Sequence, residues 1–262
     1  MPTHFPSDLH EAAAQAVTGF FSAQAHVQSV LLVNSCARAT ATPQSDLDFA
    51  ILVEADLEAP SVTALEQAWQ AHYQRQAVFG AFRRSGRFTG IHLDIITGQY
   101  QPTDLDDAGG PDSFELEIGN QVAYSLPLWQ ASDALAHLRA QWLPYYGDAL
   151  RRKRLQMVSN ACAHDLDHVA FYTHRGLHFQ AFDRLYKAFQ EFLQALCIAQ
   201  RTYPIAYNKW IRELVVDRLG LPELYLQLPP LLELQRLESD ELIFKAAALQ
   251  ALLERGTAPE DL

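Results

Sequence analysis

Two aspartates, Asp46 and Asp48, are separated by one residue at the start of the apolar segment "DLDFAILV". This composition predicts a strand, in which alternate side chains project to the same side. The two carboxylates therefore share one face and repel each other unless a cation lies between them. Magnesium takes oxygen ligands and is commonly held by one or two carboxylates together with substrate phosphates. The pair predicts a magnesium site, with two solvated carboxylates as the simpler alternative.

The segment before the pair, "SCARATATPQS", is small and polar and contains one charged residue, Arg38. Ser35 lies at the end of the preceding predicted strand, with ten residues between it and Asp46. A turn of this composition can bring backbone N–H groups and a hydroxyl against a phosphate. The sequence thus places a candidate phosphate-binding loop directly before the candidate metal ligands.

A third carboxylate, Asp94, lies in the middle of "GIHLDIITG". Its neighbours in the sequence are apolar, so we expect them to bury it. Burial of a polar group without a hydrogen-bond partner costs on the order of 2 to 7 kcal/mol, and burial of an unpaired ionised carboxylate costs more. We therefore expect a metal or another partner beside Asp94.

The elements that must position these residues alternate in type over the first half of the chain. Residues 7–27 form a predicted helix that begins after Ser7, and a second helix is predicted over 60–82. The predicted strands are 29–34, 46–53 and 87–98, with an edge strand within 120–129. From about Asp133 the chain is rich in Leu and Ala and has helical periodicity. The expected fold is α+β: residues 1–130 with a mixed sheet, and a helical domain over 131–262.

Composition restricts the function further. The chain has 262 residues, is 49% hydrophobic and carries a formal charge of -11, so a general nucleic-acid-binding surface is not expected. No apolar run is long enough to cross a membrane, no secretory leader is readable, and three cysteines without a CxxC pair suggest a reducing compartment. We expect a cytoplasmic protein. The acidic stretch 103–117 is expected to be a solvated surface loop.

These motifs resemble the signature of the polymerase-β-type nucleotidyltransferase superfamily: a glycine-serine pair, ten residues, Asp-x-Asp on the next strand, and a third acid on a later strand. The residues that match those common in small bacterial members are Ser35, Ala37, Arg38, Thr40, Ala41, Pro43, Ser45, Asp46 and Asp48. The predicted helical second half is similar to the layout of aminoglycoside adenylyltransferases. Asn34 and Ala39 stand where the superfamily usually has glycine. Asn is the residue with a side chain that best tolerates positive φ.

The resemblance implies a mechanism. Asp46 and Asp48 would hold one or two Mg²⁺ ions on the phosphates of ATP or another nucleoside triphosphate, while Asp94 would bind the second metal or take the acceptor proton. Asn34, Ser35, Arg38 and Ser45 would lie against the nucleotide. A hydroxyl would attack the α-phosphorus and release pyrophosphate.

The helical half is expected to supply the acceptor pocket and a cation for the triphosphate. Lys209, in "RTYPIAYNKWIREL", stands in a place similar to the lysine that the adenylyltransferases present to phosphate, and Lys187 is the rival candidate. Tyr203, Tyr207 and Trp210 suit stacking on a ring, although core packing is the more ordinary role.

The segment "HDLDH", residues 164–168, has two histidines four positions apart on one predicted helix face. This spacing can bind zinc, but no third ligand is obvious in the sequence. Acceptor recognition through Asp165 or Asp167 and an ordinary exposed face are the other interpretations.

The function expected from the resemblance is transfer of a nucleoside monophosphate, AMP from ATP, to a hydroxyl of a small acceptor. The acidic surface favours a cationic acceptor such as an aminoglycoside. The alternatives are an enzyme that adenylylates a protein toxin, and a non-catalytic nucleotide-binding relative in which Asn34 marks the loss of activity. A protein partner or a homodimer is compatible with each of these functions.

Overall fold

The computed structural model describes residues 5–102 and 109–257, in which helices accompany one four-stranded mixed sheet. The α+β class predicted from the sequence is confirmed. The chain forms two compact units, one of residues 1–100 and 117–144, the other of residues 101–116 and 145–262. The domain boundary expected near residue 130 stays a prediction. In the described part of the chain, no helix is long and apolar enough to cross a bilayer.

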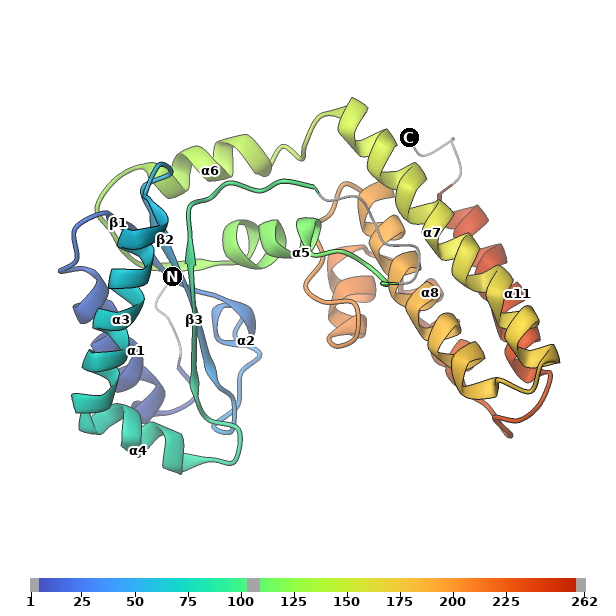
Figure 1. The fold of residues 1–262 in the computed structure, drawn as a ribbon, viewed down its shortest axis with the longest axis horizontal. Coiled ribbons are helices and arrows are strands. Elements are labelled where there is room, and N and C mark those ends of the chain that lie inside the picture. Colours follow the sequence, from blue (N-terminus) through green and yellow to red (C-terminus); the bar gives the residue numbers. More distant parts are fainter. Residues whose placement is uncertain (1–4, 103–108, 258–262) are drawn as a thin grey trace. The chain divides into compact units, whose positions relative to one another are not determined.

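The first unit contains the sheet, in which Figure 1 labels β1, β2 and β3. The strand order is β3-β2-β1-β4. β1 pairs antiparallel with β2 and β4, whereas β2 and β3 are parallel and are joined through two helices. Its elements are α1 (Asp8–Phe21), β1 (Val27–Leu32), α2 (Asn34–Ala37), β2 (Leu47–Val53), α3 (Ala59–Arg75), α4 (Ala77–Ser85), β3 (Ile91–Ile96), the π-helical turn η1 (Gly119–Ala123), β4 (Leu126–Gln130) and α6 (Ala134–Trp142). The edge position predicted for a strand within 120–129 is confirmed by β4.

Both faces of the sheet pack against helices, but not to the same extent. α1, α3 and α4 cover one face (Figure 1). On this face, Phe49 and Ile51 of β2 join a core with Val17, Trp69 and Phe82. On the other face, α6 packs through Leu135 against a small cluster that includes Ala50 and Leu52 of β2. Asp48 alternates with Phe49 and shares its face with Ala50, so it lies on the side of the sheet that α6 covers farther along β2.

The helix predicted over 60–82 is two helices, because Gln76 is extended between them (φ -92°, ψ 116°). The break lets Phe79 of α4 contact Trp69 of α3, with ring centroids 5.3 Å apart. The sequence has no glycine or proline at this point that would predict the break. The apolar contact between α3 and α4 accounts for the break instead.

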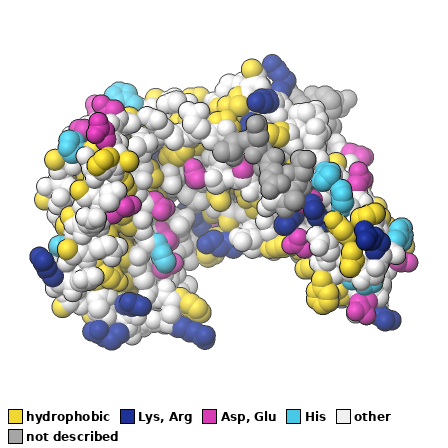
Figure 2. Space-filling view, viewed as in Figure 1, with side chains coloured by type: hydrophobic (Ala, Val, Ile, Leu, Met, Phe, Trp, Pro, Cys, Tyr) yellow, Lys and Arg dark blue, Asp and Glu magenta, His cyan; other side chains and the backbone are white. Residues whose placement is uncertain are grey.

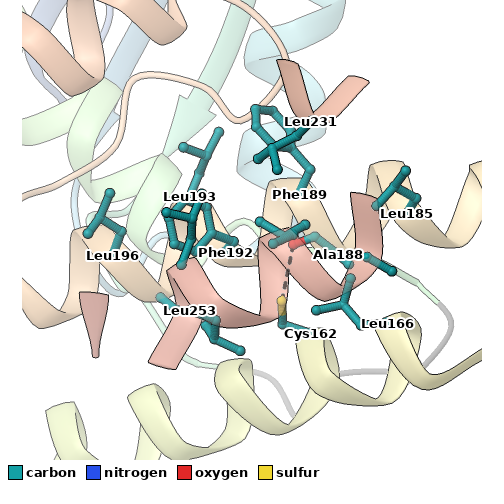
Figure 3. Close-up of a cluster of buried hydrophobic side chains, with 14 of the residues drawn as sticks. Cys162, Leu166, Leu185, Ala188, Phe189, Phe192, Leu193, Leu196, Leu231 and Leu253 are labelled. Carbon is teal, nitrogen blue, oxygen red and sulfur yellow. Dashed lines mark hydrogen bonds between the residues drawn. The ribbon is translucent and has the colours of Figure 1, made fainter. Parts of the chain in front are cut away.

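The second unit is helical in its described part. Its longest helices, α7 (Asp148–His174) and α8 (His178–Ala199), are joined by a short turn in which Gly176 has φ 72°, a conformation that favours glycine. Their shared core is shown in Figure 3, where the Cys162 thiol donates a 3.2 Å hydrogen bond to the Ala188 carbonyl. The other elements are η2 (Glu213–Arg218), α9 (Pro222–Tyr225), α10 (Leu228–Leu232) and α11 (Glu241–Gly256). α5 (Phe114–Ile118) spans the boundary between the units at residues 116 and 117.

The expectation of a solvated loop over 103–117 is wrong for Asp112 and Glu115. Glu115 is fully buried, and both carboxylates pair with the buried guanidinium of Arg154, whose nitrogens lie 2.6 Å from each. Gln194 and Tyr146 donate further hydrogen bonds to the same carboxylates. Acidic composition alone did not reveal that a basic partner lies about 40 residues farther along the chain. Residues 103–108 of this stretch lie outside the described residues.

Candidate functional site

The loop after β1 has a left-handed backbone at two positions. Asn34 has φ 56° and Ala39 has φ 58°, and both residues carry a side chain. These are the two positions at which the nucleotidyltransferase superfamily usually has glycine. The backbone therefore has the conformation that glycine would supply, although the sequence does not contain it.

Ser35 lies in the short helix α2 rather than at the end of a strand, because β1 stops at Leu32. Its carbonyl accepts a 3.0 Å hydrogen bond from the amide of Thr40, which closes the turn around Ala39. Arg38 follows the last residue of α2 and is half-buried. Ser35 and Asn34 are half-buried too, so the loop keeps its polar side chains near the surface.

The two aspartates flank Leu47 at the start of β2. Leu47 is fully buried and its amide donates a 2.9 Å hydrogen bond to the carbonyl of Gly90, which fixes the start of the strand against its parallel neighbour. Asp46 and Asp48 are half-buried and, by strand alternation, face the side opposite Leu47. The structure thus keeps the paired carboxylates accessible on one face.

The parallel register brings β3 beside the aspartates. Asp48 is aligned with His92, and Ala50 is aligned with Asp94, so His92 and Asp94 project from the same face as Asp48. His92 Nε2 lies 3.4 Å from Asp46 Oδ2. Sequence reasoning did not select His92, although its position two residues before Asp94 in an alternating strand was the available signal.

The expectation that Asp94 is buried is wrong. β3 is an edge strand, and both His92 and Asp94 are exposed on it. The apolar neighbours in the sequence project to the opposite face, where Ile91, Leu93 and Ile95 border the core under α1, α3 and α4. Because Asp94 is exposed to solvent, the cost of burying a carboxylate gives no reason to expect a metal beside it. Only the face that it shares with Asp48 supports a role as a metal ligand.

A buried histidine holds the loop that ends at Asp46. His10 of α1 is fully buried, and its Nε2 lies 3.0 Å from the carbonyl oxygen of Ser45. A carbonyl only accepts, so Nε2 carries the proton, and Nδ1 accepts from the Ser7 hydroxyl at 2.7 Å. Ser7 is in turn the N-cap of α1, as predicted. His10 therefore fixes the backbone directly before Asp46.

Ser45 has a local role in the same loop. Its hydroxyl accepts a 2.9 Å hydrogen bond from the amide of Thr42, and its own amide donates to the Thr42 carbonyl at 2.9 Å. These bonds close a tight turn around Pro43 and Gln44. The contact with a nucleotide that the resemblance implies for Ser45 stays a prediction.

Cys36 lies behind the two carboxylates. Its thiol donates to the carbonyl of Asp46 at 3.5 Å. Burial, followed by the carboxylates of Asp48 and Asp46, raises the pKa of the Cys36 thiol to about 12. The thiol is therefore neutral at physiological pH, and Cys36 acts as a packed, uncharged support below the aspartate pair.

Lys187 and Lys209 both belong to the second unit. Lys187 is half-buried on α8 and forms a 3.0 Å ion pair with Asp183, one helical turn away. Lys209 is exposed in the bend before Ile211. Tyr203 and Tyr207 are buried, in line with core packing, whereas Trp210 is 39% exposed.

The segment "HDLDH" lies within α7. Asp165 is fully buried and forms an ion pair with Arg184 of α8, so it is not available at the surface for acceptor recognition. Asp167 and His164 are exposed, and the ring centroids of His164 and His168 lie 4.3 Å apart. Throughout the described ranges, no three His, Cys, Asp or Glu side chains are grouped closely enough to hold a metal.

The donor set of Asp46 and Asp48 nevertheless fits magnesium. Two accessible carboxylates on one face match the one or two protein ligands that Mg²⁺ commonly takes when phosphates and water complete its octahedron. Asp94 is placed on the same face, one strand away. Comparison of the sequence with protein-family models finds no match, and comparison with curated proteins finds none either.

Proposed function

We propose that this protein is a metal-dependent nucleotidyltransferase that transfers a nucleoside monophosphate, AMP from ATP, to a hydroxyl of a small acceptor. One observation carries the proposal. An accessible pair of carboxylates at the start of β2 follows a loop whose backbone is left-handed at Asn34 and Ala39. The positive φ at the two positions where the resemblance expects glycine supports the proposal, although both glycines are absent.

The residues divide the chemistry between them. Asp46 and Asp48, with Asp94 as a further candidate ligand, would hold one or two Mg²⁺ ions, which supply charge stabilisation for the attacking and leaving oxygens. Ser35, Asn34 and Arg38 would contact the phosphates. Asp94 is exposed on β3 and suits a second role as the group that takes the acceptor proton.

The acceptor is proposed to be small and cationic, such as an aminoglycoside, and the site to work in the cytoplasm. The formal charge of -11 favours a cationic ligand over an anionic one in the long-range field of the protein. Lys187 and Lys209 are the two candidates for a cation that contacts the triphosphate. Separate Lys187→Gln and Lys209→Gln variants would show which of them, if either, lowers ATP affinity.

Calorimetric titration with ATP, with and without Mg²⁺, tests the proposal. We expect Mg²⁺-dependent binding that weakens more than about 100-fold in the Asp46→Asn/Asp48→Asn variant, because loss of the ligands exceeds the 10- to 100-fold effect typical of their supporting residues. Asp56→Asn/Glu66→Gln is the matched control, since it removes two exposed carboxylates of the same unit.

The outcomes separate the candidate functions. Equal binding by both double variants would contradict the metal site. Mg²⁺-dependent binding followed by pyrophosphate release with an acceptor panel supports the transferase, and binding without turnover supports a non-catalytic nucleotide-binding relative. A purified protein partner that gains the mass of one nucleotide would identify the protein-modifying alternative.

A further inference from the structure

Three arginines lie close together where α4 ends. Arg83 and Arg84 occupy the last turn of α4, and Arg87 follows in the loop that leads to β3. The first unit contains six arginines and no lysine, so half of its basic side chains fall within these five positions. All three are exposed, as is Phe88. We call Arg83, Arg84, Arg87 and Phe88 the arginine platform.

Within the described part of the chain, the arginines of the platform form no ion pairs. Among the described residues, no Asp or Glu forms an ion pair with Arg83, Arg84 or Arg87. Figure 2 shows basic side chains, which in this unit are arginines, along the lower edge of the first unit. In a chain whose net charge is -11, this patch is a local region of positive potential.

Phe88 gives the platform an aromatic surface. Its side chain is 69% exposed, and the guanidinium carbon of Arg87 lies 5.5 Å from the ring centroid. A solvated ring beside a guanidinium is the arrangement on which unpaired bases stack in single-strand-binding proteins. A phosphate ion or an acidic peptide would use the arginines but would leave the ring without a role.

The loop that carries the platform is held in place by hydrogen bonds. The buried Thr89 hydroxyl accepts from the amide of Gly86 at 3.0 Å, and the Ser85 hydroxyl donates to the Phe82 carbonyl at 2.7 Å. The amide of Arg87 donates to the Gln44 side chain at 3.4 Å. The backbone of this loop is therefore held in place before any ligand binds, which lowers the part of the entropy cost of binding that comes from ordering the loop.

Helix stabilisation accounts for only part of the platform. Basic side chains in a last turn interact favourably with the helix dipole, and this explains Arg83 and Arg84. Arg87 and Phe88 lie beyond the helix, so the helix dipole does not explain them. A ligand that covers the exposed phenyl ring of Phe88 would bind more tightly because the ring becomes buried.

We propose that the arginine platform is a docking surface for single-stranded nucleic acid, with phosphates on the arginines and a base stacked on Phe88. The overall acidity of the chain argues against nucleic acid in general, and the platform is the local exception. The surface adjoins the aspartate site, because Gln44 lies two residues before Asp46 and the Gly90 carbonyl binds the amide of Leu47. The inference does not depend on nucleotidyl transfer.

Fluorescence anisotropy with a labelled single strand of about 12 nucleotides, within the site sizes known for such surfaces, tests the proposal at several salt concentrations. We expect Arg83→Gln/Arg84→Gln/Arg87→Gln to weaken binding. The negative slope of log K against log salt should become shallower by about 2, since each single-strand phosphate contact contributes about 0.7 to its magnitude. Phe88→Ala should weaken binding about tenfold through lost stacking.

The matched control is Arg75→Gln/Lys153→Gln/Arg236→Gln, which removes three exposed positive charges elsewhere. Equal weakening by this control would show that only net charge matters and would overturn the proposal. Absence of strand binding by the unchanged protein at low salt, or tighter binding of inorganic polyphosphate that is insensitive to Phe88→Ala, would also overturn it. Strand binding that survives Asp46→Asn/Asp48→Asn keeps this result separate from the fate of the proposed transferase.

Discussion

Asn34 and Ala39 adopt a conformation that costs an L-residue about 1 to 2 kcal/mol when Cβ meets the following carbonyl. Asn reduces that cost through local hydrogen bonding, whereas alanine has no such compensation. Both residues lie in the loop that leads to the aspartate pair. Strain at a non-glycine residue in a loop beside paired carboxylates is the pattern often found at functional sites.

Ala39→Gly should therefore stabilise the protein by about 0.5 to 1 kcal/mol, because relief of the left-handed strain exceeds the extra entropy of glycine in the unfolded chain. Ala41→Gly is the control: Ala41 is in the same loop without a positive φ, and the change should destabilise by a similar amount. Urea unfolding with an unchanged m value measures both. Destabilisation by Ala39→Gly would contradict the strain at this position.

At the scale of elements, a side chain of α1 links this helix to the loop that leads into β2. His10 ties the N-cap Ser7 to the Ser45 carbonyl, and its ring also lies 4.8 Å, edge to face, from Phe82 of α4. The loop before Asp46 thus depends on a helix that begins 38 residues earlier in the sequence. Positioning of the aspartates is a property of the packed elements and not of the loop alone.

His10→Leu should lower the free energy of unfolding by about 1 to 3 kcal/mol, because the Ser45 carbonyl loses its buried donor. If the proposed site binds ATP, Mg²⁺-dependent ATP affinity should fall as well. Ser7→Ala is the control, since it removes the cap for about 1 kcal/mol and leaves the bond from His10 to Ser45 in place. Wild-type ATP affinity in a folded His10→Leu protein would show that the loop does not need this anchor.

At the scale of the whole molecule, the chain passes from the first unit into the second at residue 101, returns at 117, and enters the second again at 145. In the described part of the inserted residues 101–116, Asp112 and Glu115 are held within the second unit by their pairing with Arg154. Burial of the charges of Arg154 and Glu115 is costly in itself, and the hydrogen bonds around them compensate for that cost.

Arg154→Met should destabilise the second unit by about 3 to 5 kcal/mol, because two carboxylates would be left without their buried cation. Arg152→Met on the same helix is the matched control: Arg152 is exposed, so its change should stay within about 0.5 kcal/mol. Thermal unfolding followed by circular dichroism measures the difference. Equal effects of the two substitutions would contradict a stabilising role for the network.

The sequence by itself determined the features that follow from local patterns. An apolar run placed β2, apolar alternation placed β3, and the Ser7 cap placed the start of α1. The spacing of Asp46 and Asp48 put two carboxylates on one face of a strand. These features depend on neighbouring residues, whose geometry a helix or strand fixes without reference to the rest of the chain.

Only the tertiary structure decided which groups meet and which are buried. The edge position of β3 exposes Asp94 and brings His92 to Asp46, and the bond from His10 to Ser45 spans 35 residues. Arg154 likewise buries Glu115 from a distant helix. Such contacts leave no periodic trace in the sequence, because burial and pairing depend on how separate elements pack against one another.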